Sequence, residues 1–479
     1  MNPSVRPFYL AGEWLSREGH RTRNTLDVRN PFDGTLVATV ALASQEDMER
    51  AIEETRRGFE ETRTLGSYER AEILAGIAAQ LSAHKDEVAH LITLEAGKPI
   101  LFSRLEVDRA IMTFQVASEE AKRIPGEVIP LDLNAASRDR IGLVRRFPLG
   151  VILAISPFNF PLNLVAHKVA PAMAAGNAFI LKPSSSTPLT ALRLAEAIEA
   201  AGYPKRGFAV LATRGSDAEM MVKDDRLKMI TFTGSADIGW YLKTNAGKKR
   251  VLLELGGNAG VIVDETADLD LAVKKTAMAA FAYAGQVCIK TQRIYIHQNL
   301  FERFVEQFVR RTKELHCGDP MDDRTIVGPV IDDQSAERII SWIEEAVAMG
   351  AKVLTGGHRT GRVIEPTVLT NIDRRAKAFS QEIFGPVVTL HPFATIDEAV
   401  AGVNDSRYGL QAGVFTNNLQ HAFYAYRNLE AGGVIVNESS SYRIDPMPYG
   451  GTKDSGLGRE GIRYAIEEMT EPKLLVVEN

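Results

Sequence analysis

The strongest constraint on this chain is the regular return of short apolar runs separated by helical segments. Between residues 150 and 257 the runs are VILAIS, NAFILK, FAVLAT, LKMITFT and RVLLEL, and each is a candidate buried strand. The segment TPLTALRLAEAIEAAG has Pro188 near its start and Gly202 at its end, which is typical helix punctuation. Strands that alternate with helices in this way predict a parallel sheet covered by helices.

A second alternating series begins at residue 259. Its apolar runs are AGVIVD, RIYIH, AKVLTG, GPVVTLH, AGVFT and GGVIVN, with helical stretches such as FERFVEQFVRRTKEL between them. A length of 479 residues at 45% hydrophobic content is enough for two or three buried cores. We therefore expect two α/β domains, with a boundary close to residue 257.

Charge and composition narrow the class of partner. The net charge is -5 with acids and bases interspersed, so no basic stripe for nucleic acid is present. No apolar run has the length of a signal peptide core or a membrane span, which favours a cytoplasmic protein without membrane contact. The nine histidines and two cysteines show no metal-ligand spacing, and we expect no metal. Small molecules are the expected partners.

Two segments of the first series have features of a nucleotide site. In ITFTGSADIG a strand is followed by Gly234 for a tight turn, Ser235 as a helix cap and Gly239 for close packing, so backbone N–H groups there can hold a pyrophosphate. Lys182 ends another strand and can donate to ribose hydroxyls. An ordinary turn and a solvated lysine are the alternatives. The literal G-x-G-x-x-G match, residues 456–461, follows no expected strand and is interpreted as chance.

Three side chains are candidates for chemistry. Cys288 in AYAGQVCIKTQ is either a buried structural thiol or a nucleophile. Glu254 in VLLELGGN is either a satisfied core acid or a base whose pKa is raised by burial. Asn159 in SPFNFPLN either stabilises a turn or donates its amide to an oxyanion.

Taken together, these motifs resemble those of the aldehyde dehydrogenase superfamily over nearly the whole chain. The motifs are PFNFP, KPS, FTGS, LELGG, GQVC, EIFGP and PYGGTKDSGLGRE, in the family's order and spacing. The resemblance implies a Rossmann-like dinucleotide-binding domain at residues 1–125 and 145–256 and an α/β catalytic domain at 257–455. It also implies a small β-hairpin oligomerisation extension at 126–144, which acts with 465–479 to form a homodimer or homotetramer.

The resemblance assigns the three chemical side chains. Cys288 resembles the nucleophile that attacks the aldehyde carbon, and Asn159 the amide that holds the oxyanion together with the Cys288 N–H. Glu254 resembles the base that activates water, so that a thioester intermediate is hydrolysed to a carboxylate. The presence of Glu254 favours hydrolysis of the thioester over transfer of the acyl group to coenzyme A. A CoA-acylating semialdehyde dehydrogenase, which carries out that transfer, is the alternative within enzymes. A catalytically retired binding or structural homologue is the alternative from another class.

The resemblance also implies a nicotinamide cofactor. Glu382 matches the residue that holds the nicotinamide ribose, and Phe384 the aromatic beside it. Ser185 stands where NAD-preferring members typically have glutamate, whose carboxylate repels the 2′-phosphate of NADP. Because serine does not repel this phosphate, we expect both NADP and NAD to be used. The full set of expected cofactor residues is Ser156, Lys182, Ser185, Gly215, Phe232, Gly234, Ser235, Gly239, Leu255, Glu382 and Phe384.

Two arginines are candidates for substrate recognition, because arginine recognises carboxylate and phosphate groups well. Arg443 lies in SSSYRIDPMPYGG, and Arg104 lies on an expected helix that approaches the same pocket mouth. A surface or subunit-interface role is the alternative for each. The segment PFNFPLNLVAHKVAP looks most like the lactaldehyde and non-phosphorylating glyceraldehyde-phosphate dehydrogenase branch. We expect a small polar or anionic aldehyde: lactaldehyde-like, glyceraldehyde-phosphate-like or a semialdehyde.

Overall fold

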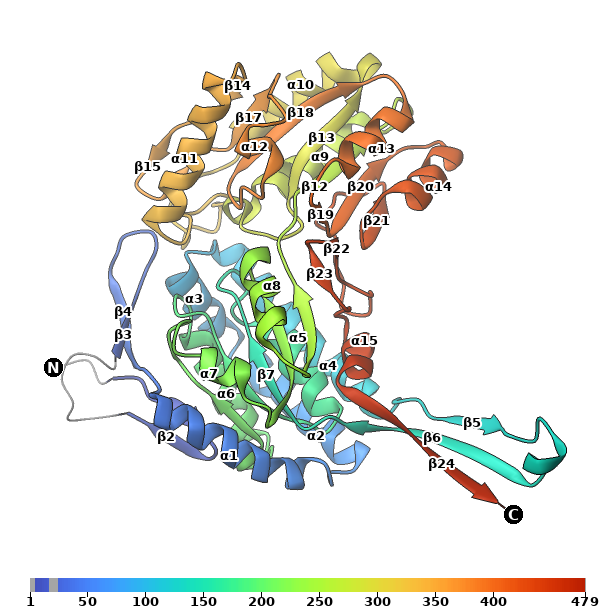
Figure 1. Ribbon diagram of the computed structural model, residues 1–479. Coiled ribbons are helices and arrows are strands. Elements are labelled where there is room, and N and C mark those ends of the chain that lie inside the picture. The colour runs from blue at the N-terminus through green and yellow to red at the C-terminus, as the bar shows by residue number, and fades with distance from the viewer. Residues whose placement is uncertain (1–4, 17–24, 479) are drawn as a thin grey trace.

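Two large sheets, each covered by helices, lie one above the other in the computed structural model, which describes residues 5–16 and 25–478 (Figure 1). The first is an eight-stranded sheet in the order β2-β1-β9-β8-β7-β10-β11-β23. Its central strands pair in parallel, whereas β1, β2 and β23 pair antiparallel at the two edges. The bounds are β2 Glu13–Leu15, β1 Phe8–Leu10, β9 Phe208–Val210, β8 Ala178–Lys182, β7 Val151–Ile155, β10 Leu227–Thr233, β11 Arg250–Glu254 and β23 Gly456–Leu457.

Helices on both faces of this sheet explain why its strands are apolar throughout. Every residue of β7 and β8 is buried, as expected for parallel strands between two helical layers. The helices of this part are α1 Gln45–Thr62, α2 Ser67–Ala83, α3 Lys85–Ala96, α4 Ile100–Glu120, α5 Asn163–Ala174, α6 Leu189–Ala200, α7 Glu219–Lys223, α8 Ala236–Asn245 and α15 Ile462–Glu468.

The second sheet has seven strands in the order β14-β17-β18-β13-β12-β20-β21, all parallel except β14. The bounds are β14 Lys352–Thr355, β17 Thr367–Thr370, β18 Val387–Phe393, β13 Thr291–His297, β12 Ala259–Val263, β20 Gln411–Phe415 and β21 Gly433–Val436. Its helices are α9 Leu269–Phe281, α10 Gln298–Lys313, α11 Asp333–Ala348, α12 Lys377–Ser380, α13 Ile396–Asn404 and α14 Leu419–Asn428.

A three-stranded antiparallel sheet projects from the body, in the order β24-β6-β5 (Figure 1). It contains β24 Thr470–Glu478, β6 Arg140–Pro148 and β5 Glu127–Pro130. Strand β24 is an edge strand whose apolar side chains are exposed, with Leu475 58% exposed. Smaller elements are β3 Thr25–Arg29, β4 Leu36–Ala41, β15 Arg359–Thr360, β16 Val363–Ile364, β19 Tyr408–Gly409, β22 Thr452–Lys453, and the 3-10 turns Ala135–Ser137, Lys205–Gly207 and Ala282–Gly285.

The predicted α/β class is confirmed, and every apolar run of the two series forms a strand. The interpretation of residues 456–461 was wrong in one respect: Gly456–Leu457 is itself a strand, β23, paired with the end of β11. A strand of two residues, one of them glycine, has no hydrophobic pattern by which to find it. The domain boundaries and oligomerisation segments stay predictions, and residues 1–4, 17–24 and 479 of those segments lie outside the described residues.

Candidate active site

Two cavities meet at Cys288 and Asn159, which line both of them. The first, here named the arginine cavity because Arg109 and Arg443 line it, has a volume of about 440 Å³. The second, here named the α8 cavity because the start of helix α8 lines it, has a volume of about 710 Å³. One thiol and one amide therefore stand between two separate binding spaces.

The position of Cys288 follows from a sharp turn after helix α9. The helix ends at Phe281, and Tyr283 and Ala284 both have a left-handed φ of 53°. This conformation is costly for residues other than glycine, and such strain is often found at functional sites. The reversal places Cys288 in the loop before β13, partly exposed between the cavities. Burial, followed by the charges of Glu382 and Glu254, raises the pKa of the thiol.

Asn159 is held against the same loop. It follows strand β7, and its Nδ2 donates to the carbonyl oxygen of Gln286 at 2.9 Å. Glu106 on α4 fixes the next residues, because its Oε1 accepts from the backbone N–H groups of Leu162 and Asn163 at 2.9 and 3.0 Å. The second N–H of the Asn159 amide remains for a ligand beside Cys288.

Glu254 is buried at the end of β11, and neither of its carboxylate oxygens has a hydrogen-bond partner within the described chain. Burial, followed by the nearby carboxylate of Glu460, raises its pKa well above the usual value. The side chain lines neither cavity in this conformation, and Oε1 lies against Gly450, where an added Cβ would be 2.8 Å away. The role of Glu254 as a base near the thiol stays a prediction.

A buried ionic chain lies behind these groups. The Nζ of Lys168 donates to Thr233 Oγ1 at 2.6 Å and to Glu460 Oε1 at 3.0 Å, while Arg443 Nη2 donates to Glu460 Oε2 at 3.0 Å. Burial raises the pKa of Glu460, but the positive charges of Lys168 and Arg443 hold this pKa below its usual value. Sequence reasoning missed Lys168 and Glu460, since Glu460 lies within the GLGREG segment interpreted as chance.

The α8 cavity brings together four of the expected cofactor residues: Gly234, Ser235, Glu382 and Phe384 line it. Ser235 is the N-cap residue of α8, but its side chain makes no capping hydrogen bond, so the first N–H groups of this helix remain for a ligand. Glu382 Oε1 accepts from the N–H of Gly257 at 3.0 Å, and burial raises the pKa of Glu382 to about 7. Phe384 packs edge to face against Phe158, with ring centroids 5.9 Å apart.

Three more of the expected residues shape the turn without lining the cavity. The ring of Phe232 lies where an added Cβ on Gly234 would be, 2.4 Å away. Leu255 is fully buried and packs so closely on Gly239 that an added Cβ would lie 2.3 Å from it. The predicted role of Gly239 in close packing is therefore the role that its surroundings require.

The remaining expected cofactor residues lie at neighbouring strand ends and line neither cavity. Lys182 ends β8, where burial lowers its pKa to about 8, and its Nζ donates to the Pro183 carbonyl at 3.2 Å. Ser185 Oγ donates to the carbonyl of Thr213 at 3.2 Å. Ser156 follows β7, and its buried Oγ has no hydrogen-bond partner among the described residues. Gly215 is exposed, with nothing within 4 Å of an added Cβ.

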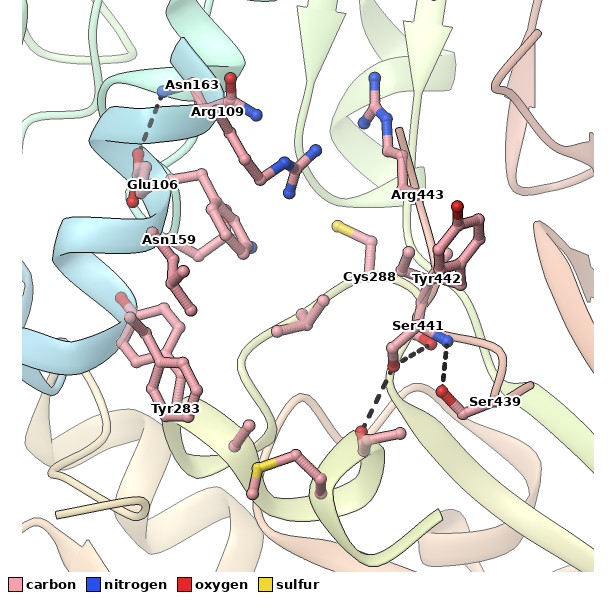
Figure 2. Close-up of a pocket in the computed structure, with 18 of the residues that line it drawn as sticks. Glu106, Arg109, Asn159, Asn163, Tyr283, Cys288, Ser439, Ser441, Tyr442 and Arg443 are labelled. Atoms are coloured by element: carbon pink, nitrogen blue, oxygen red, sulfur yellow. Dashed lines mark hydrogen bonds between the residues drawn. The ribbon is translucent and has the colours of Figure 1, made fainter. Parts of the chain in front are cut away.

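Two arginines flank the Cys288 sulfur in the arginine cavity (Figure 2). The guanidinium of Arg443 is paired with Glu460 and lies 3.6 Å from the ring centroid of Tyr449. Arg109 reaches in from α4, and its Nη2 is buried without a hydrogen-bond partner in the described chain. Burial, followed by Arg443, lowers the pKa of Arg109. This unpaired donor is the strongest signal of an anionic ligand at the site.

The expectation that Arg104 approaches the pocket was wrong. Arg104 does not line the arginine cavity; its side chain is 39% exposed and its Nη1 lies 2.6 Å from Asp323 Oδ1. Arg109 lies five residues further along α4, which is a different face of the helix. Sequence reasoning identified the helix but not the face that meets the cavity.

In residues 5–16 and 25–478, no three His, Cys, Asp or Glu side chains gather in a way that could hold a metal ion. None of the helices in the same residues combines the length and apolar character needed to cross a membrane. The cytoplasmic location stays a prediction.

A cysteine and an asparagine that line two adjoining cavities of an α/β protein mark the candidate active site of an enzyme. The chain belongs to the aldehyde dehydrogenase family, whose model matches residues 17–475. This confirms the family and the enzyme class predicted from the motifs.

Individual relatives agree with the expected branch. A 3-sulfolactaldehyde dehydrogenase of Priestia aryabhattai is 44% identical over 470 residues, covering 98% of this chain and 97% of that protein. The crystal structure of aldehyde dehydrogenase 21 from Physcomitrella patens, in complex with the reaction product succinate, has a TM-score of 0.97 and 44% identity, covering 100% of this chain and 99% of that one. The glyceraldehyde-3-phosphate dehydrogenase GapN of Methanocaldococcus jannaschii, complexed with NADP, has a TM-score of 0.92 and 39% identity, covering 96% and 100% of the two chains.

Proposed function

We propose that this protein oxidises an anionic aldehyde to a carboxylic acid with NADP or NAD, through a thioester on Cys288. The observation that carries the proposal is the place of Cys288 and Asn159, which line both the arginine cavity and the α8 cavity. A group that must contact a substrate on one side and a cofactor on the other has to stand at such a junction.

The chain's own residues supply the polar steps. The Cys288 thiol releases its proton to water in the cavity, and the thiolate sulfur then attacks the aldehyde carbon. The resulting oxyanion accepts from the free N–H of Asn159 and from the Cys288 backbone N–H. One such donor lowers a barrier by about 3 kcal/mol. Loss of a hydride converts the thiohemiacetal to a thioester. Glu254, whose raised pKa suits a base near neutral pH, takes a proton from the water that hydrolyses the thioester. This step requires the Glu254 side chain to turn from Gly450 toward the sulfur.

The α8 cavity fits a nicotinamide dinucleotide. The uncapped N-terminus of α8 and Gly234 suit a pyrophosphate, while Glu382 and Phe384 beside Cys288 suit the nicotinamide end. When bound, this group supplies the hydride acceptor. Ser185 in place of a carboxylate removes repulsion of a 2′-phosphate, which supports use of NADP as well as NAD, and GapN was solved with NADP.

Charge in the arginine cavity supports an anionic substrate. Arg109 has a buried unpaired nitrogen, and Arg443 stands on the opposite side of the sulfur (Figure 2). A guanidinium recognises a carboxylate, sulfonate or phosphate with two parallel hydrogen bonds. Among the similar proteins, one is named for sulfolactaldehyde, one was solved with its reaction product succinate, and one is named for glyceraldehyde-3-phosphate, and each of these compounds carries an anionic group.

A product assay tests the reaction class. Purified protein is given anionic and neutral aldehydes with NAD or NADP, and cofactor reduction and product are followed with and without coenzyme A. We expect free carboxylate at a rate independent of coenzyme A; a thioester of coenzyme A would instead establish acyl transfer. Cys288→Ala is expected to abolish turnover, and unchanged turnover would refute the scheme. Absence of any turnover in the wild-type protein would favour a retired homologue.

Assembly follows from the projecting sheet. Apolar side chains of β24 are exposed at its edge, and an exposed apolar edge strand is normally covered by another chain. We propose a homodimer or homotetramer formed through β5, β6 and β24.

A further inference from the structure

A fully buried lysine lies in the wall of the arginine cavity and has no part in the mechanism above. Lys98 stands between helices α3 and α4, and its side chain has no exposure. Its ammonium forms an ion pair with Glu106 on α4, whose side chain is equally buried. Taking an ammonium out of water is costly unless its donors are satisfied, so Lys98 requires further partners.

Two aromatic rings supply those partners. The Nζ of Lys98 lies 3.6 Å from the ring centroid of Phe160 and 4.6 Å from that of Tyr283. The two rings also meet edge to face, with their centroids 6.3 Å apart. An ammonium has three N–H donors, and Glu106 together with the two rings gives it three partners.

The two rings belong to the two loops that carry the reacting groups. Phe160 directly follows Asn159, which comes after β7 of the first large sheet. Tyr283 lies in the strained turn that leads to Cys288, before β13 of the second large sheet. In Figure 2, Glu106, Asn159 and Tyr283 follow one another along one side of the cavity. The separation of the amide and the thiol therefore depends on contacts between parts of the chain that belong to different sheets.

Lys98 joins the constraints on both loops. The left-handed backbone of Tyr283 is costly and persists only where the surroundings hold it. The N–H of Tyr283 donates to the carbonyl of Ile326 at 3.0 Å, and its hydroxyl donates to the carbonyl of Ala96 at 3.4 Å. Glu106 holds the loop of Asn159 through two backbone N–H groups at the start of α5. Lys98 contacts both the carboxylate that holds one loop and the ring that is fixed in the other.

We propose that Lys98 is a positioning residue, which holds the Asn159 amide and the Cys288 sulfur at the separation at which both reach one aldehyde group. It acts through Glu106 and the two rings and does not contact the substrate, since its ammonium is fully buried and already paired. This inference rests on the proposed oxidation of an aldehyde. A displacement of about 1 Å between reacting groups can lower a rate by about 100-fold, so a small shift has a measurable effect.

A double-mutant cycle tests whether Lys98 acts through Asn159. Lys98→Met replaces the ammonium by an apolar side chain of similar length that still packs on the rings. We expect kcat/KM to fall by about tenfold, equally for anionic and neutral aldehydes, because either forms the same oxyanion. Asn159→Ala should lower kcat/KM by about 100-fold, the usual loss for one oxyanion donor. Adding Lys98→Met to Asn159→Ala should then change kcat/KM by less than about twofold.

Lys249→Met is the matched control. Lys249 is also buried, with a side chain 3% exposed, but it pairs with Asp225 and lines neither cavity. This variant should keep kcat/KM within about twofold of wild type. If the losses in Lys98→Met and Asn159→Ala multiply in the double variant, Lys98 does not act through Asn159 and the inference is overturned. A loss confined to anionic aldehydes would also overturn it, because Lys98 would then recognise the substrate anion.

Hydrogen exchange gives a readout that needs no turnover. In Lys98→Met the backbone amides of residues 160–164 and 283–288 should exchange faster than in wild type, whereas Lys249→Met should leave both segments unchanged. Unchanged exchange of either segment in Lys98→Met would overturn the inference. If wild type oxidises no aldehyde while Lys98→Met still loosens both segments, the proposed function fails and Lys98 remains the constraint on both loops.

Phe160→Leu covers the case in which Lys98→Met does not fold. This change removes one ring beside the ammonium and leaves the buried ion pair of Lys98 and Glu106 intact. We expect kcat/KM to fall by about threefold or more, and this loss should disappear when Asn159 is already alanine. A loss that persists in the Asn159→Ala background would overturn the inference.

Discussion

Replacement of Arg109 by methionine is the sharpest test of how this protein recognises its substrate. Methionine keeps an apolar stem of similar length and removes the buried guanidinium, whose Nη2 has no hydrogen-bond partner in the described chain. Loss of one partner from a buried, hydrogen-bonded charge pair costs about 2–5 kcal/mol. Because the cavity is open to solvent at its mouth, we take about 2.0–2.8 kcal/mol, which is a loss of roughly 30- to 100-fold in kcat/KM.

The matched control is Arg104→Met on the same helix. Arg104 forms an exposed ion pair with Asp323, and such pairs contribute about 0–1 kcal/mol. We expect Arg109→Met to lose its 30- to 100-fold only with anionic aldehydes, and to change by less than about threefold with a neutral aldehyde. Initial rates of cofactor reduction give both values. An equal loss with neutral aldehydes, or an equal loss in Arg104→Met, would refute the assignment of Arg109 to the substrate anion.

Three further predictions follow from the site and the projecting sheet. In Glu254→Gln, a rapid burst of cofactor reduction should persist while steady-state kcat falls about 100-fold or more, the usual size of a general-base contribution. Because the raised pKa of Glu254 must be exceeded to form the base, wild-type kcat should rise with pH through that pKa, and a pH profile of Glu254→Gln with the same rise would contradict this role. Ser185→Glu should lower the NADP-to-NAD ratio of kcat/KM by about tenfold or more through repulsion of the 2′-phosphate, and an unchanged ratio would remove the argument from this position. Leu475→Glu on β24 should dissociate the assembly in sedimentation experiments with a change of no more than about 0.5 kcal/mol in subunit stability, and an unaltered sedimentation coefficient would place the interface elsewhere.

Most of the fold could be predicted from local sequence patterns. Strands such as β7 and β8 are buried on both faces. Because such strands consist of consecutive apolar residues, their positions can be predicted from the sequence alone. Strand β23 escaped prediction because its two residues, Gly456 and Leu457, hydrogen-bond as a strand only where β11 is present beside them.

The substrate side of the site was less predictable. Sequence identified helix α4 and the loop of Arg443, but residues on one helix differ in orientation by 100° per step, and only packing against α5 decides which face meets the cavity. For this reason the sequence could not show that Arg109, and not Arg104, meets the cavity. The orientation of the Glu254 side chain toward Gly450 was also unpredictable, since a sequence motif does not specify the rotation of a side chain.

By itself, then, the sequence determined the α/β class, the family, and the candidate thiol, amide and carboxylate, because short apolar runs and motifs depend on neighbouring residues. The tertiary structure alone decided which charges meet. Lys168 and Glu460 are 292 residues apart in the chain and 3.0 Å apart in space. Pairing of buried charges depends on the packing of whole elements, and no local pattern records it.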